Sequence, residues 1–327
     1  MTARKPHDSS EDLNRIVRDM VDRQTQPPLG THDSAIEIAR RESRLEMILG
    51  NRSFNLISPG GNRTCLLEPN ACTPEQLPIV ARQIMEEGLA EQVGILGTAA
   101  GGYMHVQMSN GDFCLNAIRT AAAIEHKRHP KTSNLHILCS GSDAPVECRC
   151  EDTDIIHGKV RIEAIMSDLR PNITKHGDRI ALVHMSGISH FLVRLESEEE
   201  MRTRSARDLQ ELMKQHADAV HNVPAVGAIF YTYDDRGLHI KPIVHSLITM
   251  EETGCASGSA ALGMYLHCEN EGYQNMQMLQ PSGERYVVAA SSTAAKARRG
   301  NSTTECFVDI HVASTVHIER DCTDLKS

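Results

Sequence analysis

Two stretches of the chain share one pattern, in which a polar, glycine-containing turn leads to a cysteine and then to an alanine-rich apolar run. Residues 109–123 contain Cys114, and residues 251–263 contain Cys255. Small and apolar residues occupy nearly all positions after each cysteine, which is typical of a helix buried on all sides. The pattern therefore predicts one supersecondary unit used twice, with a cysteine at the start of each buried helix.

Alternation of apolar and polar positions predicts strands on both sides of these units. They are expected at 54–57, 64–68, 92–96, 103–108, 135–139 and 159–164, and again at 180–185, 191–195, 226–231, 239–244, 285–290, 307–312 and 315–319. Further helices are predicted at 73–87, with Thr73 as N-cap and Pro74 at the first position, and at 205–220. Residues 166–177 are interpreted as a linker between two halves of the chain.

The first fifty residues follow a different pattern. Apolar residues at helical spacing between positions 13 and 21 predict a helix that ends at Pro27, and a second, charged helix is expected at 33–49. Acidic residues occur throughout this region, unlike in a transit peptide. We interpret 1–50 as an N-terminal helical extension, and a homodimer formed through its apolar stripe is the alternative.

Composition narrows the class of protein. The formal net charge is −9, aromatic residues make up 3% of the chain, and Trp is absent. Nucleic-acid binding calls for a basic face and stacking rings, so no nucleic-acid partner is expected. No run approaches the roughly 18 consecutive apolar residues of a membrane span, and the N-terminus lacks a secretory signal. No membrane partner is expected, and the cytoplasm is the expected compartment.

The ten cysteines do not follow the spacing of a disulfide framework or a zinc site. Disulfide frameworks are typical of small secreted domains. Structural zinc sites use Cys-x-x-Cys pairs, and the nearest approach here is Cys148-Arg149-Cys150, with a single intervening residue. Most of the cysteines are therefore expected to be small buried side chains, and no metal is expected.

A cysteine at a helix N-terminus has a specific chemical use. The positive end of the helix dipole favours its thiolate. The free N–H groups of the same turn can hold a carboxylate. Two such termini that face each other would hold a carboxylate from both sides and place a thiolate and a thiol across the bound carbon. This arrangement predicts a two-base racemase that needs no cofactor, and the expected partner is a small-molecule amino-acid substrate.

Several motifs, in order along the chain, resemble those of the diaminopimelate epimerase-like superfamily, and within it the histidine racemases of staphylopine-type metallophore pathways. The matching segments are 54–62 (FNLISPGGN), 91–94 (EQVG), 108–117, 187–190 (GISH), 254–259 and 280–283 (QPSG). The similarity extends over about residues 52–320, and the cysteine pair makes it specific. The first fifty residues lie outside it.

The resemblance implies an α/β (α+β) fold of two pseudo-symmetric domains, each a mixed sheet wrapped around a central helix, with the active site in the cleft between them. The domains are expected at 51–168 and 169–304, with the C-terminal strands of 305–327 returning to the first domain. The resemblance makes Cys114 and Cys255 the catalytic acid–base pair. The residues expected to hold the carboxylate and amino group of the substrate are Asn62, Gln92, Leu115, Asn116, Ala256 and Ser257. His190 either assists thiol ionisation or is a hydrogen-bonded core histidine.

Departures from the family pattern bear on the substrate. Leu115 and Ala256 stand where both cysteine motifs carry glycine, and the amide donors are kept. Met108, Ser246 and Leu247 stand where the epimerases read the second amino-acid head of diaminopimelate. Such a wall suits a medium, partly apolar side chain with one or two hydrogen-bonding atoms, because an unpaired buried charge is heavily penalised. Imidazole fits this description, and the resemblance to the histidine racemases implies the same substrate, so the expected reaction is the interconversion of L- and D-histidine.

Three alternatives stay open. The first is another racemase or epimerase of the same fold, including a broad-specificity enzyme and diaminopimelate epimerase. The second is an isomerase like that of the phenazine pathway, which typically uses a carboxylate base, so the cysteine pair argues against it. The third is a non-catalytic thiol protein, such as a metal or redox sensor. Exchange of an α-proton separates the enzymes from the sensor.

Overall fold

The computed structural model describes residues 35–154, 159–269, 275–293 and 307–322. The described residues all belong to one compact unit. The helix expected between positions 13 and 21, and Cys306, therefore lie outside the described residues. Within the described ranges, no helix has the length and apolarity needed to cross a membrane.

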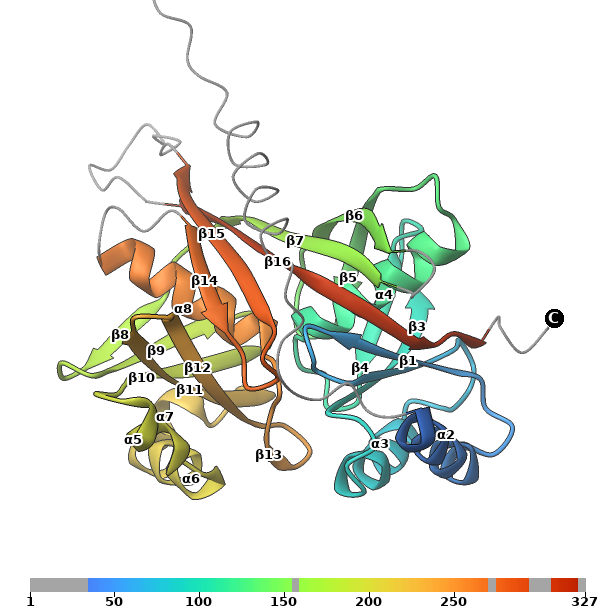
Figure 1. Cartoon of the computed structure of the whole chain (residues 1–327), viewed down its shortest axis with the longest axis horizontal. Helices are drawn as coiled ribbons and strands as arrows, with labels where there is room; N and C mark the ends of the chain where they lie inside the picture. Colours follow the sequence, from blue (N-terminus) through green and yellow to red (C-terminus); the bar gives the residue numbers. More distant parts are fainter. Residues whose placement is uncertain (1–34, 155–158, 270–274, 294–306, 323–327) are drawn as a thin grey trace, which may run out of the picture. The chain divides into compact units, whose positions relative to one another are not determined.

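The elements run in the order drawn in Figure 1. The first half contains α2 (Ala35–Leu49), β1 (Phe54–Pro59), β2 (Thr64–Leu67), α3 (Leu77–Glu86), β3 (Gln92–Thr98), β4 (Met104–Met108), α4 (Leu115–Arg128), β5 (Asn134–Cys139), β6 (Val146–Asp154) and β7 (Lys159–Leu169). The second half contains β8 (Ile173–His176), β9 (Ile180–Met185), β10 (Ile188–Arg194), α5 (Glu198–Arg202), α6 (Ala206–Gln215), α7 (Ala217–Val220), β11 (Ala225–Asp234), β12 (Gly237–His245), β13 (Thr249–Glu251), α8 (Ala256–Glu269), β14 (Asn275–Leu279), β15 (Arg285–Thr293) and β16 (Phe307–Arg320).

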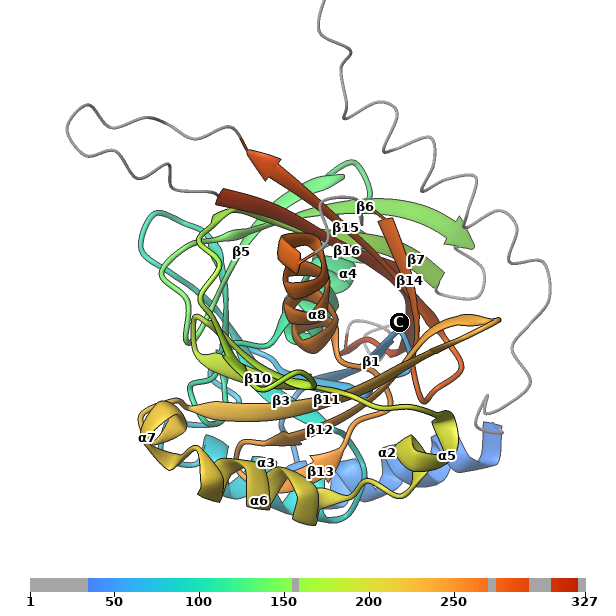
Figure 2. The same ribbon diagram turned by 90° about the vertical axis from the view of Figure 1, so that its left-hand side faces the viewer.

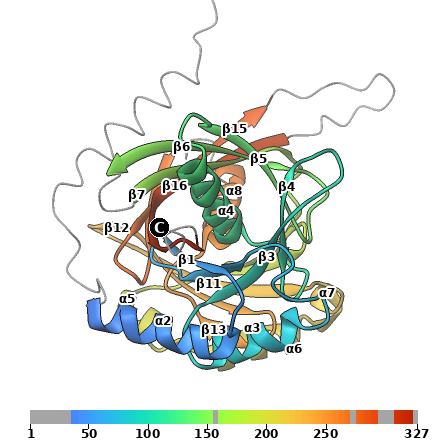
Figure 3. The same cartoon turned by 90° about the vertical axis from the view of Figure 1, so that its right-hand side faces the viewer.

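In the first half the sheet closes around a helix. Strands β1 to β7 pair in sequence order, β7 pairs with β16, and β16 pairs back with β1. The helix α4 contacts every strand of this ring, and Figure 3 shows it in the middle. Residues 115–124 of α4 are all buried, as the apolar run predicted.

In the second half the sheet continues from β16 through β15, β14, β12, β11, β10 and β9 to β8. These strands curve around α8, which contacts β9, β10, β11, β15 and β16 (Figure 2). Each half contains both parallel and antiparallel pairs, such as β2 with β3 and β10 with β11 in parallel. The predicted α+β fold, with mixed sheets around two central helices, is confirmed. The domain boundaries stay a prediction.

Small residues on α8 let the sheet approach it closely. A Cβ added at Gly258 would lie 2.2 Å from Ile229 Cδ1 on β11, and one added at Gly263 would lie 2.5 Å from Val288 Cγ1 on β15. Glycine in a helix costs about 1 kcal/mol relative to alanine. This cost is offset because glycine at these two positions allows the helix to pack closely against the sheet.

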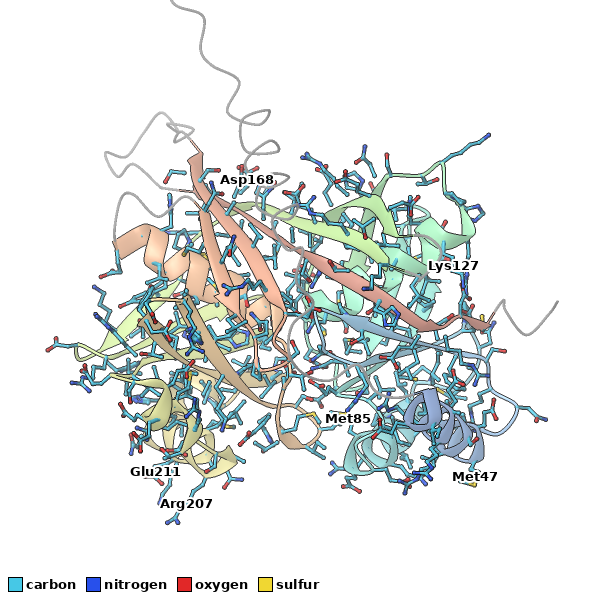
Figure 4. All side chains as sticks on the ribbon, viewed as in Figure 1. Met47, Met85, Lys127, Asp168, Arg207 and Glu211 are labelled. Atoms are coloured by element: carbon cyan, nitrogen blue, oxygen red, sulfur yellow. The ribbon has the colours of Figure 1, made fainter. Side chains whose placement is uncertain are left out.

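Helix α6 covers an outer face of the sheet and shows the opposite pattern. Its Leu209 and Leu212 are buried in an apolar cluster with the strands. Arg207 and Glu211 point away from the sheet (Figure 4). Apolar and charged residues thus divide between two faces of one helix, as expected for a surface helix.

Four predicted elements differ in the structure, and one of them is the helix expected at 205–220, which forms the two helices α6 and α7. Helix α3 begins at Leu77, after a turn at 73–76, because Pro78 has no N–H and fits only the first turn of a helix. The predicted linker at 166–177 is largely strand, since β7 continues to Leu169 and β8 starts at Ile173. The two strands expected near the C-terminus are one continuous strand, β16. Elements that the pattern did not predict are β6, β13, β14 and α5.

Candidate active site

Each central helix begins at a cysteine whose sulfur caps it. Cys114 is the N-cap of α4, with φ −130° and ψ 106°, and its Sγ accepts a hydrogen bond from Ala117 N at 3.4 Å. Cys255 repeats this contact before α8, where Gly258 N donates to its Sγ at 3.4 Å. A side chain that accepts from the N–H three residues later is an N-cap, a place usually taken by an oxygen. The repeat predicted from the two stretches is confirmed at this local level.

Both thiols are free and nearly inaccessible, with Cys114 6% exposed and Cys255 3% exposed. The amide of Cys114 donates to Cys139 Sγ at 3.5 Å, and the amide of Cys255 donates to Gln280 Oε1 at 3.1 Å. The Sγ of Cys255 also lies 3.6 Å from Ser257 Oγ. The backbone of each cysteine is therefore held by a neighbour from another segment, and each sulfur is held by its own helix.

The two cysteine turns, far apart in sequence, contact each other. Asn116 Nδ2, in the first turn of α4, donates to the carbonyl oxygen of Gly254 at 2.9 Å. Gly254 directly precedes Cys255, so this bond joins one cysteine turn to the other. The helices α4 and α8 are also in contact.

Three carboxyl groups are buried at the site, and sequence reasoning had not assigned them a role. They belong to Glu91, Asp112 and Glu252, each at most 5% exposed. All three adjoin residues that had been singled out, since Glu91 precedes Gln92, Asp112 lies two positions before Cys114 and Glu252 lies three positions before Cys255. An acidic residue within three positions of a motif residue was the available signal.

The partners of these carboxylates differ. Glu91 is well satisfied, because it accepts from Asn62 Nδ2 at 3.0 Å and from the amide and hydroxyl of Thr253 at 2.8 and 2.6 Å. Glu252 accepts from Gln92 Nε2 on one oxygen. Its other oxygen, Oε2, is buried and has no hydrogen-bond partner. The thiol of Cys255 lies beside the same carboxyl, so Glu252 connects Gln92 to the second cysteine.

Comparison of the sequence with known proteins identifies its family. Residues 52–313 match the family model described as histidine racemase CntK N-terminal domain. The chain belongs to this family. Curated histidine racemases from two strains of Fusobacterium nucleatum subsp. nucleatum are each 30% identical over 247 and 245 residues, which cover 70% of this chain and 86% of each relative. The chain is thus an isomerase of the racemase and epimerase type.

Solved structures show the same fold at low sequence identity. A hydroxyproline epimerase from Agrobacterium vitis has a TM-score of 0.53 and 11% identity, covering 81% of this chain and 90% of that one. A phenazine biosynthesis protein of the PhzF family from Bacillus anthracis has a TM-score of 0.57 and 10% identity, and a putative PhzC/PhzF protein from Clostridium difficile has 0.52 and 12%. Each of these two covers 82% of this chain and 96% of its own. These likenesses concern the fold alone.

The side chains expected to hold the substrate of this racemase are engaged with the buried acids. Asn62 donates to Glu91 and accepts from Thr64 Oγ1 at 3.1 Å, and Gln92 donates to Glu252. The first helical turns also contain the other four expected ligands, which are Leu115, Asn116, Ala256 and Ser257. The structure thus brings these segments together, and their role as substrate ligands stays a prediction.

His190 reaches the second cysteine only through a serine. Its Nε2 lies 3.2 Å from Ser257 Oγ, which in turn lies 3.6 Å from Cys255 Sγ. Complete burial lowers the pKa of His190 to about 3, so its ring is neutral. The ring nitrogen Nδ1 has no hydrogen-bond partner. His190 can therefore orient the Ser257 hydroxyl but carries no charge that would stabilise a thiolate.

The predicted specificity wall is divided in the structure. Met108 belongs to the central apolar cluster around α4 and α8. Leu247 instead packs against the cluster beneath α2 and α3, and His245 Nδ1 contacts Thr249 Oγ1 at 2.8 Å. The buried acids are additional polar groups at the cysteine turns. That Met108, Ser246 and Leu247 contact the side chain of the substrate stays a prediction. The buried acids are further groups that could contact it.

Among the residues that the structure describes, one group could share a metal ion, namely Glu198, Asp234 and His239. Each ring nitrogen of His239 already contacts a carboxylate at 2.8 Å, Nδ1 with Glu198 and Nε2 with Asp234. Arg236 pairs with both carboxylates as well. The group is an ion-pair network between α5 and the β11–β12 hairpin, and we assign no metal to it.

Burial controls the ionisation of the acids. Burial, together with the negative charge of Glu91, raises the pKa of Glu252 to about 8. Burial also raises the pKa of Asp112 to about 6 and that of Glu91 above its usual value. Because a low-dielectric surrounding disfavours the charged form, Glu252 is largely protonated at neutral pH in the ligand-free protein.

Burial has the same effect on the thiols. It raises the pKa of Cys114 and of Cys255 well above the usual value, and the neighbouring carboxylates of Asp112 and Glu252, respectively, raise it further. The helix termini alone favoured thiolates, and that expectation is wrong for the ligand-free protein. Loss of hydration outweighs a helix dipole worth up to about 2 kcal/mol.

Replacing Glu252 by glutamine should stabilise the protein at alkaline pH. A carboxyl whose pKa is raised in the folded state binds its proton more tightly there, so its contribution to stability falls as pH rises from about 4.5 to about 8. We expect Glu252→Gln to increase the free energy of unfolding by about 2 to 4 kcal/mol at pH 8.5 and much less at pH 5. Urea denaturation at both pH values measures this, with Glu251→Gln as the exposed neighbouring control. An equal effect of Glu252→Gln at both pH values would contradict the raised pKa.

Proposed function

We propose that the enzyme interconverts L- and D-histidine, with Cys114 and Cys255 as its two bases. The observation that carries this proposal is the pair of buried thiols, each capping a central helix, in turns joined by the bond from Asn116 to Gly254. Membership of the family supports an amino-acid racemase. The names of the relatives support histidine as its substrate.

In the proposed reaction the α-carboxylate is held by the N–H groups of both first turns, at Leu115–Asn116 and Ala256–Ser257. These groups have no partner within a helix and lie at its positive end. One thiolate takes the α-proton, so the C–H bond breaks as an S–H bond forms. The electron pair left on carbon is delocalised into the carboxylate, where the N–H groups stabilise it. The other thiol gives its proton to the opposite face, and the two sulfurs exchange protonation states in each turnover.

The substrate itself supplies the charge that makes a thiolate accessible. In the ligand-free protein, burial keeps both thiols protonated, and any negative charge on Asp112 or Glu252 raises their pKa further. Histidine brings a positive ammonium group, and a cation beside these carboxylates offsets the charge that opposes thiolate formation. Glu252 Oε2, buried and without a partner, is the acceptor we assign to a positively charged or N–H group of the substrate.

The acidic surroundings also favour histidine over diaminopimelate. An imidazole can donate an N–H to a carboxylate, and its protonated form is a cation. Diaminopimelate also brings a distal carboxylate, for which the buried acids Glu91, Asp112 and Glu252 offer no positive partner. Like charges at low dielectric repel strongly, and a buried charge without a partner costs several kcal/mol.

Substrate preference tests this proposal. We expect kcat/KM for L- and D-histidine to exceed that for diaminopimelate by about 1000-fold or more, which corresponds to roughly 4 kcal/mol. A panel of amino acids in deuterium oxide, with α-proton exchange followed by NMR and inversion by chiral chromatography, gives both substrate and reaction. Preference for diaminopimelate would overturn the assignment of substrate. Equal rates across the panel would identify a broad-specificity racemase.

The same assay addresses the other two classes of protein. A phenazine-type isomerase would depend on a carboxylate, here Glu252 or Asp112, and not on the thiols. A thiol sensor would exchange no α-proton with any amino acid. We place the reaction in the cytoplasm, where reduced thiols such as Cys114 and Cys255 are stable.

A further inference from the structure

A buried tyrosine on β15 contacts three segments of the site. The side chain of Tyr286 is fully buried. Its hydroxyl lies 2.9 Å from the carbonyl oxygen of Pro59 and 3.2 Å from Asn116 Oδ1, and its one proton is donated to one of these acceptors at a time. Asn116 then donates to Gly254 at 2.9 Å. A continuous series of contacts thus runs from the first hairpin through Tyr286 and Asn116 to the turn of the second cysteine.

The chain leaves space for this ring at two glycines. A Cβ added at Gly60 would lie 1.9 Å from Tyr286 Cε1. One added at Gly254 would lie 2.9 Å from the Tyr286 hydroxyl and 2.7 Å from the carbonyl oxygen of Gly60. Any side chain at either position would displace the ring, since such distances are well below van der Waals contact. The hairpin and the second cysteine turn therefore both need glycine at these positions to accommodate Tyr286.

A buried cation lies over the ring. Arg119 lies on α4, is fully buried, and places its guanidinium 5.1 Å from the centroid of the Tyr286 ring. Its Nη2 donates to the backbone and hydroxyl oxygens of Ser314 on β16, while Nε and Nη1 make no hydrogen bond. A buried charge with so few partners is costly, and contact with an aromatic face recovers part of that cost. The proton transfers described above make no use of Arg119.

We propose that Tyr286 is a positioning residue for racemisation, which keeps the two cysteine turns in register so that both sulfurs reach one α-carbon. The inference rests on the proposed two-base reaction. Either base alone can exchange a proton, but inversion requires the second sulfur on the opposite face at the same moment. A misplacement of about 1 Å can lower a rate by about 100-fold. Tyr286 acts through Asn116 and Gly254 and touches no reacting atom.

The test is Tyr286→Phe, which removes the hydroxyl and keeps the ring over Arg119. In deuterium oxide the wild type should place label in the product and little in recovered substrate, because different sulfurs remove and return the proton. The variant should show kcat reduced by about 10- to 100-fold, KM changed little, and a several-fold higher ratio of labelled substrate to labelled product. A purely structural role would lower the active fraction and leave this ratio unchanged, and that result would overturn the proposal.

Two further variants sharpen the test. Tyr231→Phe, at a buried tyrosine on β11, should retain the wild-type ratio. Asn116→Leu removes the same link at its other end and should raise the ratio as Tyr286→Phe does. If both act through one link, the double variant Tyr286→Phe/Asn116→Leu should be little worse than the worse single variant. Independent, additive effects on the ratio would contradict a shared link.

A measurement without substrate separates this inference from the proposed function. Hydrogen exchange followed by mass spectrometry should show faster exchange in segments 58–62 and 253–257 of Tyr286→Phe, and wild-type exchange there in Tyr231→Phe. If the wild-type enzyme does not racemise histidine, the proposed function fails and this measurement still judges the link. Unchanged exchange in both segments would overturn the positioning role.

Discussion

Cys114→Ser and Cys255→Ser should each reduce the racemisation of histidine by about 1000-fold or more. A serine oxygen keeps the helix cap but is a far weaker base than a thiolate near neutral pH. The remaining thiol can still serve one face of the α-carbon. Each variant should therefore retain α-proton exchange for one enantiomer, and the two variants should retain it for opposite enantiomers. Chiral chromatography measures inversion, and NMR in deuterium oxide measures exchange.

Cys72→Ser is the matched control for these substitutions. Cys72 lies before α3 in a separate apolar cluster and caps neither central helix. Its variant should racemise at nearly the wild-type rate. Near-normal racemisation by Cys114→Ser or Cys255→Ser would contradict the two-base reaction. Loss of inversion with exchange of the same enantiomer in both variants would exclude their assignment to opposite faces.

Glu252→Gln should reduce kcat/KM for histidine by about 100-fold at pH 8.5 and remove one limb of its pH dependence. In the ligand-free enzyme the pKa of Glu252 is about 8, so the carboxyl is protonated below that pH and cannot pair with a cation. Since kcat/KM reports the ionisation of the free enzyme, it should rise with pH up to about 8 in the wild type. In Glu252→Gln this rise should disappear. The loss of about 100-fold corresponds to one charge-assisted hydrogen bond of roughly 2.7 kcal/mol.

The neighbouring glutamate provides the control. Glu251 is exposed and pairs with Lys241, so Glu251→Gln removes one negative charge from the same segment without touching the buried site. It should retain the wild-type rate and pH profile. An unchanged profile in Glu252→Gln would show that this carboxyl does not bind the substrate cation. A profile altered equally by both variants would indicate a general effect of charge.

Several features of this protein follow from short stretches of its sequence. The two cysteine caps depend on a turn and on the first residues of a helix, and the predicted contacts are seen as matching 3.4 Å bonds to Ala117 and Gly258. The burial of α4 and α8 follows from apolar residues on all faces. Strand positions followed from alternation, which needs no knowledge of the partner strand. Where a local signal was ambiguous, as at Pro74 and Pro78, the predicted start of helix α3 was wrong.

Only the tertiary structure decided which distant segments contact each other and how burial changes the pKa of their ionisable groups. Pairing of β16 with β1 closes the first ring, and no local pattern specifies that pairing. Gln92 meets Glu252 across 160 residues, and the hydroxyl of Tyr286 lies on Asn116 across 170 residues. The sequence places a cysteine at a helix terminus and so favours a thiolate. Only the packed structure shows that loss of water raises the pKa of both thiols and of Glu252, because desolvation depends on everything that surrounds a group.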